Sequence, residues 1–477
     1  PIILRFLSTR VIKRESGFVA NSLHKAFKKG RRPVFLFWFC VSLSLLPLCR
    51  AVEAAGSVRI TPSISVKAEH DDNVDFDVTD ARSRFRTIIN PAFSFDYNKD
   101  TLNIILTANC KATNYWETSE DEDFSVTVDP GAALSYATEL LAVKLTIDTE
   151  TISYTDETGD DEKNKWKIDF SGGYQYSERL KIDLGLSEAM DTTLSSELEE
   201  TGLVDTQGDR HRYEMSGGFS YQLSAVSNID FSYNRKVTEY DSPGQTDYDS
   251  ENILFSYGRR LSSRRDTLTI IPKYSRTDSD NTEMETYSLS LGWAHDFSPT
   301  LNLSVSLGRR YTETKYRLIR PEIVFLPASW PPIEVTYPQI EHLVQNQGVI
   351  GDISLRKIGE LYSLAIGYNR DVSYSSRGLP IEVDKLYWQF GLEVSERLRA
   401  GLTGSYYYTR SEDETDEVDS VYFKLAPFLN YQVSRDSFLK FEYSYDNSLD
   451  YTLTDTDDDE ATRHRFLATF SYVFPQE

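Results

Sequence analysis

Cysteine is scarce in this chain, and its three copies are unevenly placed. Cys40 and Cys49 lie near the N-terminus, and Cys110 stands alone in the long remainder. A single thiol forms no internal disulfide and no thiolate metal cluster. The body of the chain is therefore neither a disulfide scaffold nor a thiolate zinc module.

Positive charge is also in deficit. The 477 residues carry 51 Lys and Arg against 74 Asp and Glu, a formal net charge of −23. A phosphate backbone is bound by basic patches, which this composition does not provide. Nucleic acid is excluded as a natural partner.

Long apolar runs are missing after residue 46. The one run, Val34 to Leu46, follows the basic cluster at 28–32 and precedes small residues at 52–54. That order is typical of a secretory signal peptide, and the run is too short for a comfortable transmembrane helix. We expect residues 1–54 to be an upstream extension plus a cleaved signal, with a retained signal anchor as the alternative. Residues 55–477 then form one exported domain.

What the exported part does contain is a repeated hairpin, clearest at Thr286 to Tyr316. Apolar Tyr287, Leu289, Leu291 and Trp293 alternate with small residues, and after a break containing Ser298 and Pro299 the alternation resumes. A strand places alternate side chains on opposite faces, so each arm has one apolar and one polar face. A soluble sandwich and a membrane barrel both fit a single hairpin.

The number and spacing of the copies favour the barrel. Nine such hairpins with short turns recur every 40 to 45 residues, and an unpaired strand stands at each end of the domain. The connections between hairpins are long and acidic, for example 70–81, 156–164, 191–209, 277–281 and 446–460. Short turns on one side and long loops on the other are typical of outer-membrane barrels, with the short turns in the periplasm. The fold class predicted is all-β: a transmembrane antiparallel up-and-down barrel of about 20 strands, with 18 as the alternative.

A barrel of this size encloses water. The residues predicted to face its lumen are polar and, taken together, acidic: Asp169, Asp183, Asp230, Asn302, Gln389, Glu393, Lys440 and Glu442. Strand 1 begins close to the predicted cleavage site, so we expect no plug domain of the siderophore-receptor kind. The sequence predicts a pore.

One loop, 317–346, differs from the others. It carries five prolines together with Phe325, Trp330 and Tyr337. Its stiffness and apolar content predict that it folds into the mouth and narrows the pore, with the three aromatics available to stack on sugar rings. A cap that packs on neighbouring loops is the alternative.

Catalytic chemistry has little support. Three histidines lie beside a carboxylate in sequence (Asp209 near His211, His295 with Asp296, Glu341 with His342), but none sits in a nucleophile motif. The acidic run 455–460 lacks the glycine of a calcium-binding loop. We predict no enzyme activity, no cofactor and no resident metal.

Two features resemble a known family. They are the opening segment, Ile60 to Val66 followed by His70 to Val74, and the Ser-Glu-Arg-Leu turns at 177–180 and 395–398. They are similar to the outer-membrane β-barrel porins that accompany exopolysaccharide gene clusters. The resemblance implies a component of polysaccharide secretion, paired with a periplasmic export protein that lacks its own outer-membrane pore.

Three functions stay open from the sequence. The first is an outer-membrane pore for export or diffusion of polysaccharide or sugars, in contact with lipid and lipopolysaccharide. The second is a non-conducting surface barrel that acts as an anchor or adhesin through its acidic loops. The third is a membrane-embedded enzyme. The acidic loops favour a neutral polymer, or one screened by cations.

Overall fold

The computed structural model describes most of the chain from Ser57 onward. The described residues are 57–74, 76–78, 81–116, 124–156, 159–203, 208–242, 245–319, 339–376, 378, 380–411, 419–451 and 459–475. The predicted signal segment, 1–54, lies outside them. Contacts divide the chain into a small unit, of which 57–58 and 97–100 are described, and the barrel unit formed by 59–96 and 101–477. In the small unit the Ser57 hydroxyl donates to the Asn98 carbonyl at 3.2 Å.

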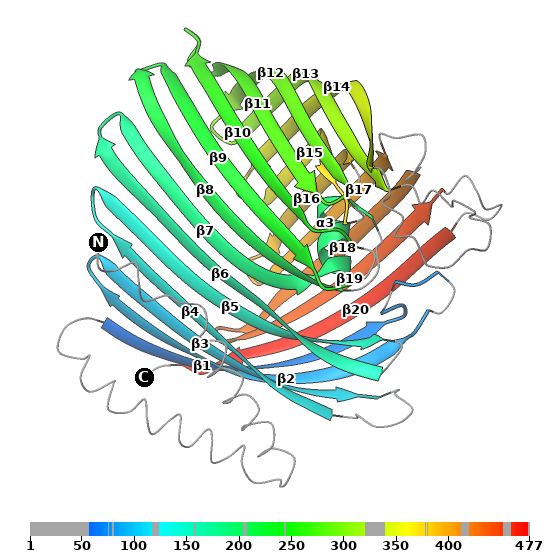
Figure 1. The fold of residues 1–477 in the computed structure, drawn as a ribbon. Helices are drawn as coiled ribbons and strands as arrows, with labels where there is room; N and C mark the ends of the chain where they lie inside the picture. Colours follow the sequence, from blue (N-terminus) through cyan, green and yellow to red (C-terminus); the bar gives the residue numbers. More distant parts are fainter. Residues whose placement is uncertain are drawn as a thin grey trace, which may run out of the picture. The chain divides into compact units, whose positions relative to one another are not determined.

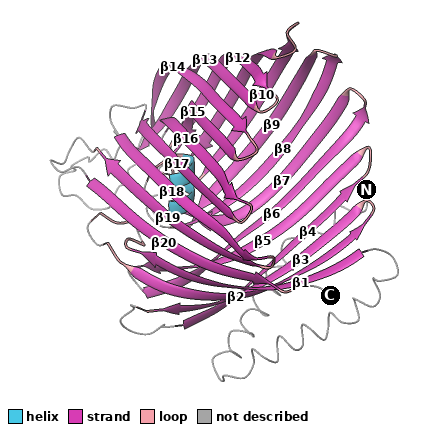
Figure 2. Ribbon diagram, turned by 180° about the vertical axis from the view of Figure 1, so that it is seen from behind, coloured by secondary structure: helices cyan, strands magenta, loops and turns pink. Residues whose placement is uncertain are grey.

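The chain forms 20 antiparallel strands, drawn in Figures 1 and 2. Each is paired with its neighbours in sequence, and β1 also pairs with β20 from Ser63–Val473 to Asp71–Arg465. This last pairing closes the sheet, so the prediction of a 20-stranded antiparallel barrel is confirmed. The strands are β1 Ser57–Asp71, β2 Arg84–Lys99, β3 Leu102–Tyr115, β4 Phe124–Ala137, β5 Leu141–Asp156, β6 Gly159–Ser177, β7 Leu180–Thr192, β8 Asp209–Ser224, β9 Ser227–Tyr240, β10 Tyr248–Arg260, β11 Asp266–Ser279, β12 Thr282–Ser298, β13 Leu301–Ile319, β14 Gln339–Ile358, β15 Tyr362–Tyr374, β16 Pro380–Ser395, β17 Leu398–Ser411, β18 Asp419–Ser434, β19 Ser437–Asp450 and β20 Asp459–Val473.

Nine short turns lie at one end of the barrel, where the nine hairpins were predicted. Serine shapes several of them. The Ser177 hydroxyl accepts the amide of Leu180 at 3.2 Å, and the pairing of β6 with β7 shifts register just before it. Pairs of serine hydroxyls lie 2.7 Å apart across the turns at 224–227 and 434–437. Serine satisfies the turn backbone locally, which fixes where each strand reverses.

The long-loop side differs from the prediction at two places. Segments 156–164 and 277–281 were predicted to be long loops, but β6 already begins at Gly159 and only 280–281 separate β11 from β12. The backbone register continues through both segments as paired strands. Acidic residues disfavour strands only weakly, and pairing with a neighbouring strand overrides that preference.

The outer face is apolar and exposed, and the inner face is polar. Leu184, Leu291 and Leu307 stand 57 to 63% exposed on the outside. In the part of the chain that the structure describes, one helix interrupts the all-β pattern: α3, Thr193–Glu200, in the connection between β7 and β8. No helix among the described residues is long and apolar enough to cross a membrane.

Candidate functional site

The eight residues predicted to line the pore all stand on the inner face of the wall. Each alternates along its strand with outward apolar neighbours, as Asp183 does between Ile182 and Leu184. Cross-strand pairs keep the same face, as Asn430 with Lys440 does. Their contact with a moving solute stays a prediction. The residues so placed are Asp169, Asp183, Asp230, Asn302, Gln389, Glu393, Lys440 and Glu442.

The inner wall carries charges of both signs. Lys167 lies 3.0 Å from Asp169, Lys181 lies 2.8 Å from Asp183, and the predicted residues Lys440 and Glu442 lie 2.7 Å apart. In each pair the partners are two positions apart on one strand, so both face the lumen. Lys167 and Lys181 were not among the predicted lining residues, although each stands two positions from a predicted aspartate.

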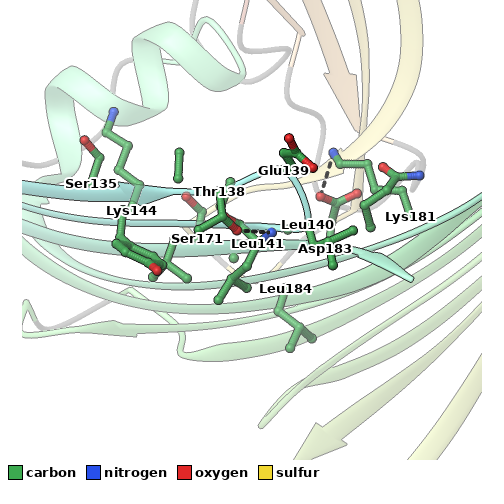
Figure 3. Close-up of a pocket in the computed structure, with 17 residues that line it drawn as sticks. Ser135, Thr138, Glu139, Leu140, Leu141, Lys144, Ser171, Lys181, Asp183 and Leu184 are labelled. Atoms are coloured by element: carbon green, nitrogen blue, oxygen red, sulfur yellow. Dashed lines mark hydrogen bonds and ion pairs between the residues drawn. The ribbon is translucent and has the colours of Figure 1, made fainter. Parts of the chain in front are cut away.

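A hollow of about 430 Å³ lies near the short turn between β4 and β5. Figure 3 shows one such ion pair beside it. Inward polar side chains from β4 to β7, among them Ser135, Lys144 and Ser171, surround it. Lys181 and Asp183 lie at its edge, joined by the dashed contact in the figure. Inward polar side chains of four strands therefore line this hollow together with apolar residues of the turn, such as Ala137 and Leu140.

The opposite end of the barrel is narrowed by α3. On one side α3 is bonded to β8 and β9, and on the other to β16 and β17. Strands β8 and β17 lie on opposite sides of a closed 20-stranded ring. A short helix that bonds to both lies inside the lumen, as Figures 1 and 2 both show.

Ion pairs hold α3 to β8 and β9. Arg210, which is fully buried, donates to Asp191 at 2.9 Å and to Glu200 at 3.3 Å. Arg212 donates to Glu200 at 2.9 Å, and the Lys236 ammonium lies 3.3 Å from the same carboxylate. Burial alone would raise the pKa of Glu200, but the charges of Lys236, Arg210 and Arg212 lower it to about 2. Glu200 therefore stays ionised and bound across the physiological range.

Backbone acceptors of α3 hold the other side. Tyr407 donates to the Glu199 carbonyl at 2.8 Å, and Lys385 donates to the same oxygen at 3.2 Å. The Thr409 hydroxyl donates to the carbonyl of Thr201. At Gly202 φ is +76°, and an added Cβ would lie 2.5 Å from the Tyr407 Cβ. Only glycine allows this approach at that backbone angle.

An apolar core joins α3 to other segments inside the mouth. We call it the mouth cluster, and its members are almost fully buried. It combines the 72–78 connection, α3 and four strands, whereas a barrel wall alone has no interior core. Phe76 packs edge-on against Tyr422, with 6.3 Å between the ring centroids. The Arg463 guanidinium lies over the Phe76 ring, 5.1 Å from its centroid. The members are Phe76, Leu198, Ile381, Val383, Tyr407, Tyr422 and Ala461, with Leu203 packed against them.

The tip of the β15–β16 hairpin also folds into the lumen. The Tyr374 hydroxyl contacts Ser279 at 2.7 Å and also contacts Thr282, and its ring lies 5.1 Å from that of Tyr248. The amide of Thr246 donates to the Ser376 carbonyl at 2.7 Å. These partners come from β10 to β12 and the connection before β10, several strands away in the ring. The hairpin tip therefore crosses to the inner face of a distant part of the wall.

Three inward segments thus meet in the mouth: 72–78, 193–203 and 372–383. All three lie in connections that were predicted to be long acidic loops. A signal was present for α3, because 193–200 contains no Gly or Pro and places Leu194 and Leu198 four residues apart. Nothing local predicts which wall each segment meets.

The loop predicted to narrow the pore falls mostly outside the described residues, which omit 320–338. Phe325, Trp330 and Tyr337 lie in that gap, so their stacking on sugars stays a prediction. Of the histidines, His295 bonds Asp266 at 2.7 Å across the β11–β12 pair. His211 lies 3.7 Å from Asp241. Neither contact involves its carboxylate neighbour in sequence.

A closed antiparallel barrel with an apolar outer face and a polar lumen is an outer-membrane β-barrel. The protein is located in the bacterial outer membrane.

Comparisons with known proteins find only distant structural similarities. No protein-family model and no curated protein matches the sequence. The siderophore receptor PirA from Pseudomonas aeruginosa is 10% identical, with 88% of this chain and 81% of that one covered and a TM-score of 0.45. The outer membrane protein OpdK from the same organism is 8% identical, with 87% of this chain and 99% of that one covered and a TM-score of 0.38. OccAB3 from Acinetobacter baumannii is 9% identical over 87% and 99%, at 0.39. We draw no function from similarities this low.

Proposed function

We propose that this protein is an outer-membrane pore for polar solutes, and that the inward segments at its mouth set how far it opens. The observation that carries the proposal is α3, bonded from inside the lumen to opposite walls of the ring. A solute that traverses the barrel must pass this helix or displace it. The alternating Lys and Asp of the inner wall suit hydrated, polar cargo.

The finer part of the proposal is that the cargo is a sugar or a neutral polysaccharide. Small hydroxyl side chains recur along the inner face of β12 and β13, among them Ser288, Ser304 and Ser306. Such groups exchange hydrogen bonds with sugar hydroxyls without attracting one sign of charge. The secretion role and its periplasmic export partner rest on sequence resemblance alone.

A barrel that does not conduct is the second candidate. The specific observation that favours it is the mouth cluster, in which Phe76 and Ile381 are at most 1% exposed. A core this well buried resists opening, and a permanently closed barrel would present its acidic loops as an anchor or adhesin.

Single-channel conductance in a planar bilayer separates the two candidates. The critical variant replaces 193–208 by a short Gly-Ser turn, which the fold permits because Thr192 and Asp209 are paired across the hairpin. We expect a larger conductance than in the wild type, and we expect neutral oligosaccharide to block it. A second variant shortens 320–338, whose flanking residues Ile319 and Gln339 are also paired.

This second variant tests the loop that the sequence predicts to narrow the pore. A rise in current on shortening 320–338 would add that loop to the constriction. Folding is checked by the shift in gel mobility on heating. If the wild type and both variants are folded but conduct no current, the anchor is the better account.

A further inference from the structure

The wall of the barrel is incompletely paired between β14 and β15. Strand β14 pairs with β13 along its whole length, from Leu301–Lys357 to Ile319–Gln339. With β15 it pairs only from Gly351–Arg370 to Ile358–Ser363. Beyond that point the hairpin tip of β15 and β16 has turned into the lumen. Within the described residues, the edge of β14 from 342 to 350 therefore faces no partner strand.

A cavity of about 610 Å³ lies at this seam. Four guanidinium groups line it: Arg309 and Arg310 from β13, Arg370 from β15 and Arg410 from β17. One carboxylate, Glu382 on β16, lines it with them. In a chain with a net charge of −23, this is a local concentration of positive charge.

Glu382 organises three of the four arginines and does not neutralise them. Its oxygens lie 3.1 Å from Arg310 and 2.8 Å from Arg370, and the Arg410 Nε donates to it at 2.7 Å. Asp384 adds a weaker contact to Arg370, at 3.6 Å. Two carboxylates against four guanidiniums leave an excess of positive charge, and Arg309 is an exposed member of the set.

The backbone adds to the site. At Gly348 an added Cβ would lie 2.8 Å from the Arg310 Nε, so the missing side chain lets this guanidinium lie against β14. Asn346 and Gln347 complete the lining with amide groups. Guanidinium forks beside N–H donors form the arrangement that recognises phosphate oxygens.

The height of the cavity on the wall indicates the source of the phosphate. On β13 the outward side chains nearest the short turn are apolar: Leu303, Val305 and Leu307. The next outward residue toward the long loops is Arg309. On β13 the outward aliphatic residues therefore end at the cavity, on the long-loop side. In the outer membrane the headgroups of the outer leaflet lie at that level.

We propose that the Arg309–Arg310–Arg370–Arg410 cavity binds a phosphate group on the headgroup of an outer-leaflet lipid, of the phosphorylated lipopolysaccharide kind. The bound headgroup covers the unpaired edge of β14 from the membrane side. This site lies in the wall, apart from the route through the lumen, and its occupancy does not require that the barrel conducts.

Native mass spectrometry of the purified full-length protein tests the site, with bis-phosphorylated lipid A and the same lipid dephosphorylated as probes. Arg309→Gln removes the exposed arginine and leaves the Glu382 contacts in place. Arg235→Gln, on the outer face of β9, is the control of equal charge. We expect the phosphorylated lipid to bind, the dephosphorylated lipid to bind weakly, and Arg309→Gln to lose about tenfold in affinity.

Three results would overturn the proposal. Equal binding of the two lipids would show that phosphate is not recognised. Equal losses in Arg309→Gln and Arg235→Gln would reduce the effect to general surface charge. Stabilisation by inorganic phosphate that Arg309→Gln removes, with no discrimination between the lipids, would assign the cavity to a soluble anion.

Discussion

The hydroxyl of Tyr407 on β17 donates a 2.8 Å hydrogen bond to the main-chain carbonyl of Glu199 in α3. The adjacent residue, Glu200, is bound by Arg210 and Arg212 of β8 on the far side of the ring. Two consecutive residues of one short helix therefore connect opposite walls. A substitution on either wall is expected to release the helix from that side. Single substitutions can therefore test how α3 is attached at the mouth.

Tyr407→Phe removes the hydrogen bond to Glu199 and keeps the ring in the mouth cluster. The lost bond is worth about 1 kcal/mol, so the population with α3 displaced is expected to rise about fivefold. Single-channel recording would show this as more frequent wide openings. Tyr406→Phe is the matched control, because that neighbour points outward and is 38% exposed. Identical records for the two variants would mean that the Tyr407 bond does not hold the helix.

Gly202→Ala places a methyl group 2.5 Å from the Cβ of Tyr407, at a backbone angle that alanine rarely adopts. The left-handed conformation alone costs about 1–2 kcal/mol. We expect α3 to move away from β17 and the mean conductance to increase. Gly172→Ala serves as the control, since its nearest neighbour would be a Phe170 ring atom at 3.9 Å. A variant that keeps wild-type conductance would show that the segment accommodates the methyl group elsewhere.

Acid is expected to weaken the attachment of α3 to β8. The pKa of Glu200 is about 2 in the folded protein and 4.5 ordinarily, so it is lowered by its place there. A lowered pKa stabilises the attached helix fully above pH 4.5, and this contribution is lost as pH falls toward 2. Conductance should therefore rise between pH 4.5 and pH 2. From pH 5 to 7 Glu200 stays ionised, so it should cause no change in conductance over that range.

Glu200→Gln isolates that effect. It removes the charge that Lys236, Arg210 and Arg212 bind, so wide openings should already appear at neutral pH and the acid response should diminish. Glu199→Gln is the control, because this exposed neighbour meets the far wall through its carbonyl oxygen. A Glu200→Gln protein with the full acid response would assign the response to another group.

Phe76→Ala empties the centre of the mouth cluster. Truncation of a buried phenylalanine costs about 3–5 kcal/mol, and here the loss is expected in the inward segments while the barrel stays folded. Hydrogen exchange should show faster exchange at 193–203, with strand amides unchanged. Phe76→Leu should restore most of the protection. Faster exchange throughout the strands would mean that the cluster supports the barrel as a whole.

The alternation in sequence was enough to predict the wall. Inward Asp183 and outward Leu184 follow from a period of two. The serine turns marked the strand ends at one side. These features depend on neighbours in sequence or on the adjacent strand, so local sequence patterns predict them.

The mouth was not predictable in the same way. Phe76, Leu198 and Ile381 lie in three connections or strand ends far apart in sequence, and no local pattern states that they share a core. The acid-rich composition of 191–209 suggested a solvated loop. Pairing of Glu200 with Arg210, Arg212 and Lys236 explains why it folds inward instead.

A closed barrel of about 20 strands, its two faces and its membrane location follow from the sequence alone, because each depends on short-range periodicity and turn chemistry. Only the folded structure shows the exact strand number, what fills the mouth and where the wall stays unpaired. Those features arise when the ring closes and brings β8 opposite β17 and β13 beside the turned-in β15–β16 tip. Contacts of that kind depend on the geometry of the whole barrel, which no single stretch of the chain encodes.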